Sequence, residues 1–197
     1  LPRQLARQLS PVESAATGIR LSPTAVNHFK QCPRSFFYRY VVGLPEIGYR
    51  SDSGKTGQPA PAHLVGSVVH RSCELLATGV DLIQALRQAV ADMVPHHWRE
   101  EVGAAALLLL ERLINSDFFR EAALYPSCQE VSFTYYLRPA DNSGQVFEFN
   151  GSIDRLLFYP DGSLGIIDYK TDQIESEQVE QRAKSYQWQL ALYVLAA

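Results

Sequence analysis

Two aspartates and a lysine, all embedded in apolar sequence, are the residues best placed to do chemistry. Asp154 closes the run Gly151-Ser-Ile-Asp154, and Asp168 and Lys170 lie in Ile166-Ile-Asp-Tyr-Lys170. A carboxylate among Ile and Leu side chains is unfavourable unless it is paired or ligated, because its desolvation costs several kcal/mol. Two carboxylates together with water suit a hard divalent cation such as Mg²⁺. The pattern therefore favours a metal site with a lysine beside it.

A hairpin is the element that must position these residues. The segments 146–159 and 164–169 alternate between apolar and polar residues, and the turn Pro160-Asp-Gly-Ser163 separates them. Alternation on both sides of an Asp-Gly turn predicts two antiparallel strands. In such a hairpin Asp154 and Asp168 lie roughly opposite each other, within reach of one cation.

Lys170 follows Asp168 by one strand period, so both side chains are expected on the same face while Tyr169 points away. Two acids and a lysine would then converge. The same residues also fit a structural ion pair, in which either aspartate pairs with Lys170 or Arg155 and no chemistry follows. The hairpin pattern alone leaves both interpretations open.

The other expected elements are mainly helices. Ser22 and Pro23 are typical of a helix start, and Pro33 is expected to break that helix. Apolar periodicity predicts further helices, and alternation predicts one more strand. The expected helices are 66–77, 81–94, 103–119 and 175–197; the strand begins at residue 129; a loop covers 43–62 and a turn 139–144. This order predicts an α/β domain with a mostly antiparallel sheet of three strands flanked by helices.

Five separated motifs, in this order of elements, resemble the PD-(D/E)XK nuclease superfamily and specifically its RecB-like branch. They are the opening helix 21–40, the segment Gly66-Ser-Val-Val-His70, the Gly151 to Asp154 strand, the Asp168-Tyr-Lys170 strand, and the helix segment Gln189-Leu-Ala-Leu-Tyr193 preceded by Tyr186. The resemblance runs from about Leu21 to Ala197. It implies a restriction-endonuclease-like core.

The resemblance also implies a role for each matching residue. His70, Asp154, Asp168 and the backbone carbonyl of Tyr169 would bind the metal, Lys170 would orient or activate the attacking water, and Gln189, Tyr193 and Tyr186 would support the site and approach the DNA. His70 is therefore expected beside the two aspartates in space. Glu130 matches a weaker acidic position of the branch, but it reads equally well as a solvated glutamate at a strand edge.

A metal-dependent deoxyribonuclease is the function that this resemblance implies. A phosphodiester resists attack chiefly through its negative charge, which a cation and a lysine would offset. Mg²⁺ or Mn²⁺ is the expected cofactor, and the histidine favours Mn²⁺ because imidazole prefers softer metals. The alternative is a catalytically inactive nuclease-like module that binds DNA or acts as a scaffold. The intact Asp154, Asp168 and Lys170 count against that alternative.

Composition limits the classes of protein and of partner. The chain has 197 residues, 46% of them hydrophobic, with a formal net charge of −3. This charge argues against a protein that holds nucleic acid mainly by a basic surface, although bound cations would offset part of it at a metal site. No apolar run is long enough to span a bilayer, so we expect no membrane partner and a cytoplasmic location.

The three cysteines are an odd number without a CxxC pair, which indicates no disulfide framework. Some relatives in the RecB-like branch hold a 4Fe–4S cluster with one cysteine near the opening helix and three close to the C-terminus. Cys32 has the first position, but no such triplet follows. We expect no iron–sulfur cluster, and we expect Cys32 to be a small residue buried in the core.

Residues 1–20 show little periodicity and are expected to be a linker or arm before a nuclease domain at 21–197. The chain begins without Met and ends within an apolar run, so we expect a fragment of a larger protein. The resemblance suggests a helicase-nuclease of DNA repair or recombination, with DNA as substrate and a helicase motor in the same parent chain or complex. A standalone exonuclease or a CRISPR-adaptation nuclease is the alternative.

The opening helix also carries an aromatic group beside basic residues. The aromatic residues are Phe36, Phe37, Tyr38 and Tyr40, and the basic ones are Lys30, Arg34 and Arg39. Such a combination can stack on unpaired bases. Packing of the Phe residues in the core is the interpretation that we favour from sequence, with the basic residues in contact with phosphate.

Overall fold

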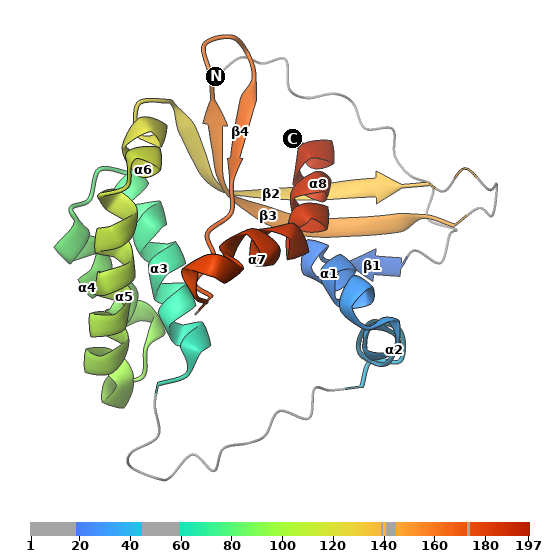
Figure 1. Cartoon of the computed structure of the whole chain (residues 1–197), viewed down its shortest axis with the longest axis horizontal. Helices are drawn as coiled ribbons and strands as arrows, with labels where there is room; N and C mark the ends of the chain where they lie inside the picture. The colour runs from blue at the N-terminus through green and yellow to red at the C-terminus, as the bar shows by residue number, and fades with distance from the viewer. Residues whose placement is uncertain (1–18, 45–59, 139, 141–144, 173) are drawn as a thin grey trace.

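The structure is a computed structural model that describes residues 19–44, 60–138, 140, 145–172 and 174–197 (Figure 1). Its strands are β1 (Ile19–Leu21), β2 (Ser127–Leu137), β3 (Phe147–Phe158) and β4 (Leu164–Ile167). Its helices are α1 (Pro23–Gln31), α2 (Pro33–Phe36), the π-helical η1 (Phe37–Val41), α3 (Ala62–Ala77), α4 (Leu82–Met93), the 3₁₀ turn η2 (His96–Trp98), α5 (Arg99–Ile114), α6 (Asp117–Ala122), the 3₁₀ turn η3 (Ser176–Gln178), α7 (Val179–Ser185) and α8 (Gln187–Ala196). None of the helices in these ranges is long and apolar enough to cross a bilayer.

The sheet is mixed, and β3 is its central strand. β2 and β4 both pair with β3 in antiparallel fashion, whereas β1 pairs with it in parallel. The predicted α/β class with a mostly antiparallel sheet is confirmed. The predicted count of three strands is wrong, because Ile19–Leu21 forms β1 at the boundary between the expected linker, 1–20, and the expected domain. Three residues are too few to show a period, and their pairing with Phe147 to Phe149 is a tertiary contact. The other linker residues, 1–18, lie outside the described part of the chain.

The opening helix begins and breaks where the sequence predicts. The Ser22 hydroxyl accepts the N–H of Ala25 at 3.2 Å, and α1 ends at Gln31 before Pro33 starts α2. The burial expected for Cys32 is wrong: it is exposed, and its sulfur accepts the N–H of Ser35 at the start of α2. Cys32 therefore acts as the cap that joins two helices.

Two other helix predictions need correction. The helix expected at 103–119 begins earlier, at Arg99, and ends at Ile114, because the Ser116 hydroxyl accepts the N–H of Phe119 and starts α6. The C-terminal helix is divided at Tyr186 into α7 and α8. Most of the predicted loop 43–62 and of the predicted turn 139–144 lies outside the described residues.

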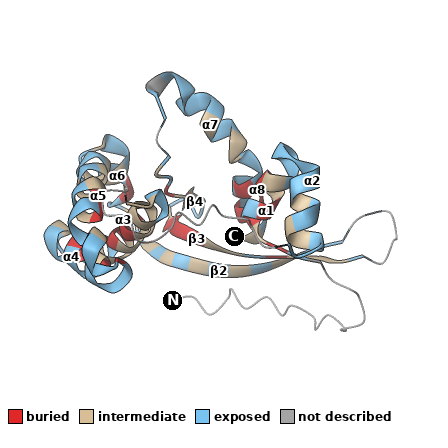
Figure 2. Cartoon of the chain, turned by 90° about the horizontal axis from the view of Figure 1, so that it is seen from below, coloured by how far each residue is buried: buried red, intermediate tan, exposed pale blue. Residues whose placement is uncertain are grey.

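The helices form two groups around the sheet, as the view in Figure 2 shows. The helices α1, α2, α7 and α8 lie on one side of β2 and β3, while α3 to α6 gather at the end of these strands. One buried cluster joins α3 to α6 with Leu157, Ile167 and Tyr169 of the hairpin. A second cluster packs Leu192 of α8 against Phe149 of β3. The β3–β4 hairpin is therefore held from both groups of helices.

Gly151 lets α1 approach the sheet closely. A Cβ at this position would lie 2.8 Å from Cζ of Phe133 and 3.0 Å from Cγ of Pro23, both closer than van der Waals contact. We expect Gly151→Ala to lower the free energy of unfolding by about 1–3 kcal/mol, as overpacking does.

Urea unfolding followed by circular dichroism measures this effect, and Gly103→Ala is the matched control. Gly103 lies in α5, and a Cβ there would lie 3.7 Å from Val90, an ordinary contact. This control should be neutral or stabilising by up to about 1 kcal/mol, because alanine favours a helix interior. Equal effects of the two substitutions would contradict the close approach at Gly151.

Candidate active site

The β3–β4 hairpin brings the two aspartates to one place. Arg155 pairs with Ile167, so the same register, extended by one residue, sets Asp154 opposite Asp168. Both side chains are largely buried, with exposed fractions of 11% and 6%. Asp154 also accepts the backbone N–H of Tyr169 at 2.7 Å through Oδ2, which fixes the chain where it leaves β4.

His70 of α3 reaches the same carboxylate from the helical half of the molecule. Its Nδ1 lies 3.4 Å from Oδ2 of Asp154, and its Nε2 lies 3.0 Å from the carbonyl oxygen of Tyr169. Gly66, one helical turn earlier, permits this approach, because a Cβ there would lie 3.0 Å from Oγ1 of Thr171. Because Gly66 and His70 are four residues apart, the close contact of Gly66 with Thr171 and the ring of His70 lie on one face of α3.

The His70 ring lies between two hydrogen-bond acceptors. A neutral imidazole has one N–H, so it can donate to Asp154 or to the Tyr169 carbonyl but not to both. In either tautomer a ring lone pair faces an oxygen lone pair. A cation between the ring and the carboxylate, or a second proton on the ring, would remove this repulsion. The donor set therefore fits a metal ion.

Glu130 completes the cluster through a strained backbone. The β2–β3 ladder keeps one register on both sides of Glu130, which lies opposite Asp154 but makes no ladder pair itself. Its φ of 48° is in the left-handed region, which costs a non-glycine residue about 1–3 kcal/mol. Ligand atoms of Glu130, His70 and Asp154 all lie within 4.8 Å of one another. The sequence did not decide whether Glu130 is a metal ligand or a solvated glutamate at a strand edge. The geometry groups it with the candidate ligands.

Asp168 has a different set of partners from Asp154. Its Oδ2 forms an ion pair with the Lys170 ammonium, and its Oδ1 accepts the side-chain N–H of Gln189 at 3.0 Å. The Tyr193 hydroxyl lies 3.5 Å from the same Oδ1, and burial raises the pKa of Tyr193 to about 12, so it stays protonated. Asn27 of α1 donates to Gln189 at 3.4 Å. Asp168 is thus held by α8, and α8 by α1.

The ion pair considered from sequence therefore exists on one side of the site. Asp168 pairs with Lys170, whereas Arg155 donates to the carbonyl of Ala122 and to the Ser127 hydroxyl. A cation that reached Asp168 would have to share its Oδ2 with the lysine.

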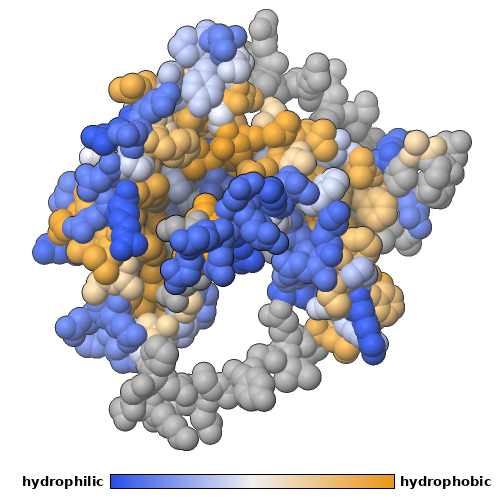
Figure 3. All heavy atoms as spheres, in the orientation of Figure 1, coloured by the Kyte–Doolittle hydropathy of each residue, from blue (hydrophilic) through white to orange (hydrophobic). Residues whose placement is uncertain are grey.

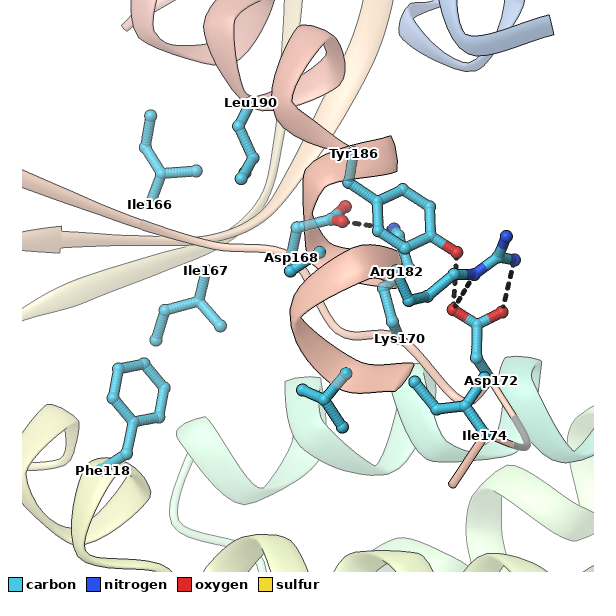
Figure 4. Close-up of a pocket in the computed structure, with 12 residues that line it drawn as sticks. Phe118, Ile166, Ile167, Asp168, Lys170, Asp172, Ile174, Arg182, Tyr186 and Leu190 are labelled. Atoms are coloured by element: carbon cyan, nitrogen blue, oxygen red, sulfur yellow. Dashed lines mark hydrogen bonds and ion pairs between the residues drawn. The ribbon is translucent and has the colours of Figure 1, made fainter. Parts of the chain in front are cut away.

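A second polar group supports Lys170, and sequence reasoning missed two of its members. Arg182 forms two hydrogen bonds to Asp172, and the Tyr186 hydroxyl donates to the same carboxylate at 2.6 Å (Figure 4). The Tyr186 ring lies under the Lys170 ammonium, 5.1 Å from ring centroid to nitrogen. The hydrogen bonds from Arg182 hold the pKa of Asp172 below its usual range. The available signal was that Asp172 continues the two-residue period of Asp168 and Lys170.

Burial sets the electrostatics around Asp154. Desolvation raises the pKa of Asp154, while the His70 ring and the Tyr169 N–H act in the opposite direction. A nearby cation would favour the ionised carboxylate. Burial also raises the pKa of the neighbouring Cys73 to about 12, so this thiol stays protonated and is a core residue.

Cavities open on both sides of the cluster. One, of about 400 Å³, is lined by His70, Glu130 and Gly66. Another, of about 430 Å³, opens beside Asp168, Lys170 and Tyr186 and has an apolar wall (Figure 4). A ligand can therefore approach the acids from either direction.

The comparison with protein families agrees with this arrangement. The family model described as the PD-(D/E)XK nuclease superfamily matches residues 20–197, which is nearly the whole chain. No curated protein matches the chain. Phosphodiester hydrolysis is the activity that the family match implies. The chain, with its Gly151 to Asp154 strand and its Asp168-Tyr-Lys170 strand, belongs to the PD-(D/E)XK nuclease superfamily.

Proposed function

We propose that the chain is a metal-dependent deoxyribonuclease domain. One observation supports this most directly: His70, from a helix remote in sequence, lies between the Asp154 carboxylate and the Tyr169 carbonyl. A neutral imidazole has one N–H, so it cannot donate a hydrogen bond to both of these acceptors at once. A divalent cation resolves that conflict, and hydrolysis of DNA is the reaction that such a site in this superfamily would serve.

His70, Glu130 and Asp154 would hold the cation, with the Tyr169 carbonyl and Asp168 as further ligands. When bound, the metal would polarise the phosphate oxygens and lower the pKa of an attacking water. Carboxylate oxygens suit Mg²⁺ and Mn²⁺ alike, and the imidazole favours Mn²⁺.

Lys170 would place its positive charge beside the reacting phosphate. Gln189 and Tyr193 hold Asp168 through its Oδ1, so the Asp168–Lys170 pair keeps a defined direction. The Tyr186 ring, whose hydroxyl donates a hydrogen bond to Asp172, supports the lysine from the other side. These residues would position the lysine without taking part in bond breaking.

We further propose the RecB-like branch and a helicase-nuclease of DNA repair or recombination as the setting. The support is the resemblance of the opening helix 21–40 and of the Gly66 to His70 segment to that branch. DNA cleavage by the native assembly should then depend on ATP, although cleavage by this domain should not. ATP-independent cleavage by the native assembly would instead favour a standalone exonuclease.

The central test compares His70→Ala with His63→Ala, which is an exposed histidine seven residues earlier on the same helix. The wild type and His63→Ala should cut linear DNA with Mn²⁺ or Mg²⁺ and not with EDTA. His70→Ala should lose at least about tenfold in rate, the scale of losing a group that supports a metal site. DNA binding without any metal-dependent cleavage by the wild type would select the inactive scaffold instead.

A further inference from the structure

The N-terminal helices carry basic residues and no acidic ones. Residues 22–44 contain Lys30, Arg34 and Arg39 and no Asp or Glu, in a chain whose formal net charge is −3. The charged residues of α1, α2 and η1 themselves are therefore all basic. Such local segregation, and not total charge, is what a nucleic-acid backbone senses.

Aromatic rings are exposed on the same helices and at the start of α8. Phe29 is 49% exposed and Trp188 is 44% exposed, and Phe37 and Tyr38 are similarly open. Core packing, which the sequence favoured, therefore holds for Phe36, which contacts a buried cluster, but not for Phe37. In Figure 3, hydrophobic and hydrophilic residues lie together at the surface around α2. Exposed rings of this kind are platforms on which bases stack.

Cations and rings are interleaved on this surface. The Lys30 ammonium lies 4.7 Å from the Trp188 ring centroid, and the Arg34 guanidinium lies 5.7 Å from that of Tyr38. We name Phe29, Lys30, Arg34, Tyr38 and Trp188 the aromatic-basic face. It combines three exposed rings with two cations, and single-strand binding surfaces likewise combine stacking rings with a positive charge that follows the backbone.

A polar groove connects this face to the candidate active site. The groove, of about 300 Å³, lies between α1 and the α7–α8 segment. Asn27, His28 and Gln31 line it on α1, and Ser185, Tyr186 and Lys170 line it on the other side. Lys30 and Trp188 contact each other, and each is the chain neighbour of a groove residue, Gln31 on α1 and Gln189 on α8. The face therefore adjoins the groove.

We propose that the aromatic-basic face binds an unpaired DNA strand and that the groove guides its backbone to Lys170. This inference rests on the proposed function, because it takes the Lys170 side of the cavity as the place of cleavage. An unpaired strand is favoured over a duplex because a duplex keeps its bases stacked inside and would leave these rings without a partner. A duplex would depend mainly on phosphate contacts, for which this face offers two cations, Lys30 and Arg34.

Fluorescence anisotropy tests the proposal without cleavage. The chain is titrated, in EDTA, with a labelled single strand, the same sequence as a duplex, and an abasic strand of equal length. The single strand should bind most tightly, and the abasic strand should lose the stacking contribution. Trp188→Ala should weaken single-strand binding by about fivefold or more, the loss expected for one stacked base. Lys30→Gln should lower the salt dependence of binding by about 0.7 in log–log slope.

Tyr136→Ala and Lys184→Gln are the matched controls. Tyr136 is an exposed ring on β2, and Lys184 is an exposed cation on α7 that pairs with Glu180. Both should bind like the wild type. Tighter binding of the duplex, or wild-type binding by Trp188→Ala and Lys30→Gln, would overturn the proposal and leave this face to a protein partner. Because binding is measured without metal, failure of the nuclease assignment would appear separately, as absence of cleavage with Mn²⁺.

Discussion

Replacing Asp154 by Asn is expected to abolish metal-dependent cleavage without loss of the fold. The carboxylate lies in the candidate ligand cluster with His70 and Glu130, and it is largely buried. Asn keeps the shape and can accept the Tyr169 N–H, but it removes the negative charge that a cation needs. We expect cleavage to fall by more than about 100-fold, beyond the loss of a supporting partner. Calorimetric titration with Mn²⁺ should show binding lost in parallel.

The same substitution should stabilise the metal-free protein in a pH-dependent way. Burial raises the pKa of Asp154 in the folded chain, so between about 3.9, its unfolded value, and that higher pKa the folded state holds more protons. Wild-type stability must therefore fall as pH rises through this window, and the cost remains above it. Asp154→Asn has no carboxylate to desolvate, so its melting temperature in EDTA should exceed that of the wild type by a margin that grows through this window and is constant above it.

Asp92→Asn is the control, since Asp92 is an exposed acid on α4. It should leave cleavage and Mn²⁺ binding unchanged and show no such gain in melting temperature. An Asp154→Asn protein that cut DNA at the wild-type rate would remove this carboxylate from the site. A variant that was less stable than the wild type at every pH would mean that hydrogen bonding at Asp154 outweighs its desolvation.

Lys170→Met is expected to impair turnover far more than metal binding. Methionine keeps most of the apolar stem and removes the charge that pairs with Asp168. Loss of one preorganised electrostatic donor beside a developing negative charge should lower kcat by about 10² or more. Affinity for Mn²⁺ should change little or rise, because a competing cation has left the Asp168 carboxylate. Calorimetry and cleavage of linear DNA on the same sample separate the two quantities.

Lys184→Met removes an equal charge from α7, where Lys184 pairs with Glu180, and should leave both quantities unchanged. If Lys170→Met instead lost Mn²⁺ binding and kept normal turnover at saturating Mn²⁺, the lysine would serve the metal and not the reaction. If Lys170→Arg restored activity, the reaction would need the positive charge at this position and not an ammonium group in particular.

The hairpin that carries the two acids could be predicted from local sequence. Alternation along β3 and β4 shows which residues share a face, and the turn between them is encoded by its own residues. Gly162 has φ of 84°, and Asp161 accepts the Ser163 N–H at 2.9 Å. These interactions span two or three residues, so residue types alone set the register that places Asp154 opposite Asp168.

Helix starts were predictable for the same reason, because a cap is a contact between near neighbours. The Ser22 cap followed the sequence signal, whereas the Ser116 cap was missed within a long apolar run that favoured one helix. Helix periodicity is a weak guide where apolar residues surround the whole helix, as in Leu107 to Leu110.

Sequence by itself determined the hairpin, the acids in it and the lysine one strand period away. Only the tertiary structure decided that His70 reaches Asp154, that Glu130 joins them through a left-handed φ, and that Gln189 donates to Asp168. Each of these contacts depends on how α3, β2, α8 and the hairpin pack. Packing is driven by burial of apolar area, which has no direction and does not specify partners far apart in sequence. The contacts appear only when complementary shapes, such as Gly66 against Thr171, bring the elements together.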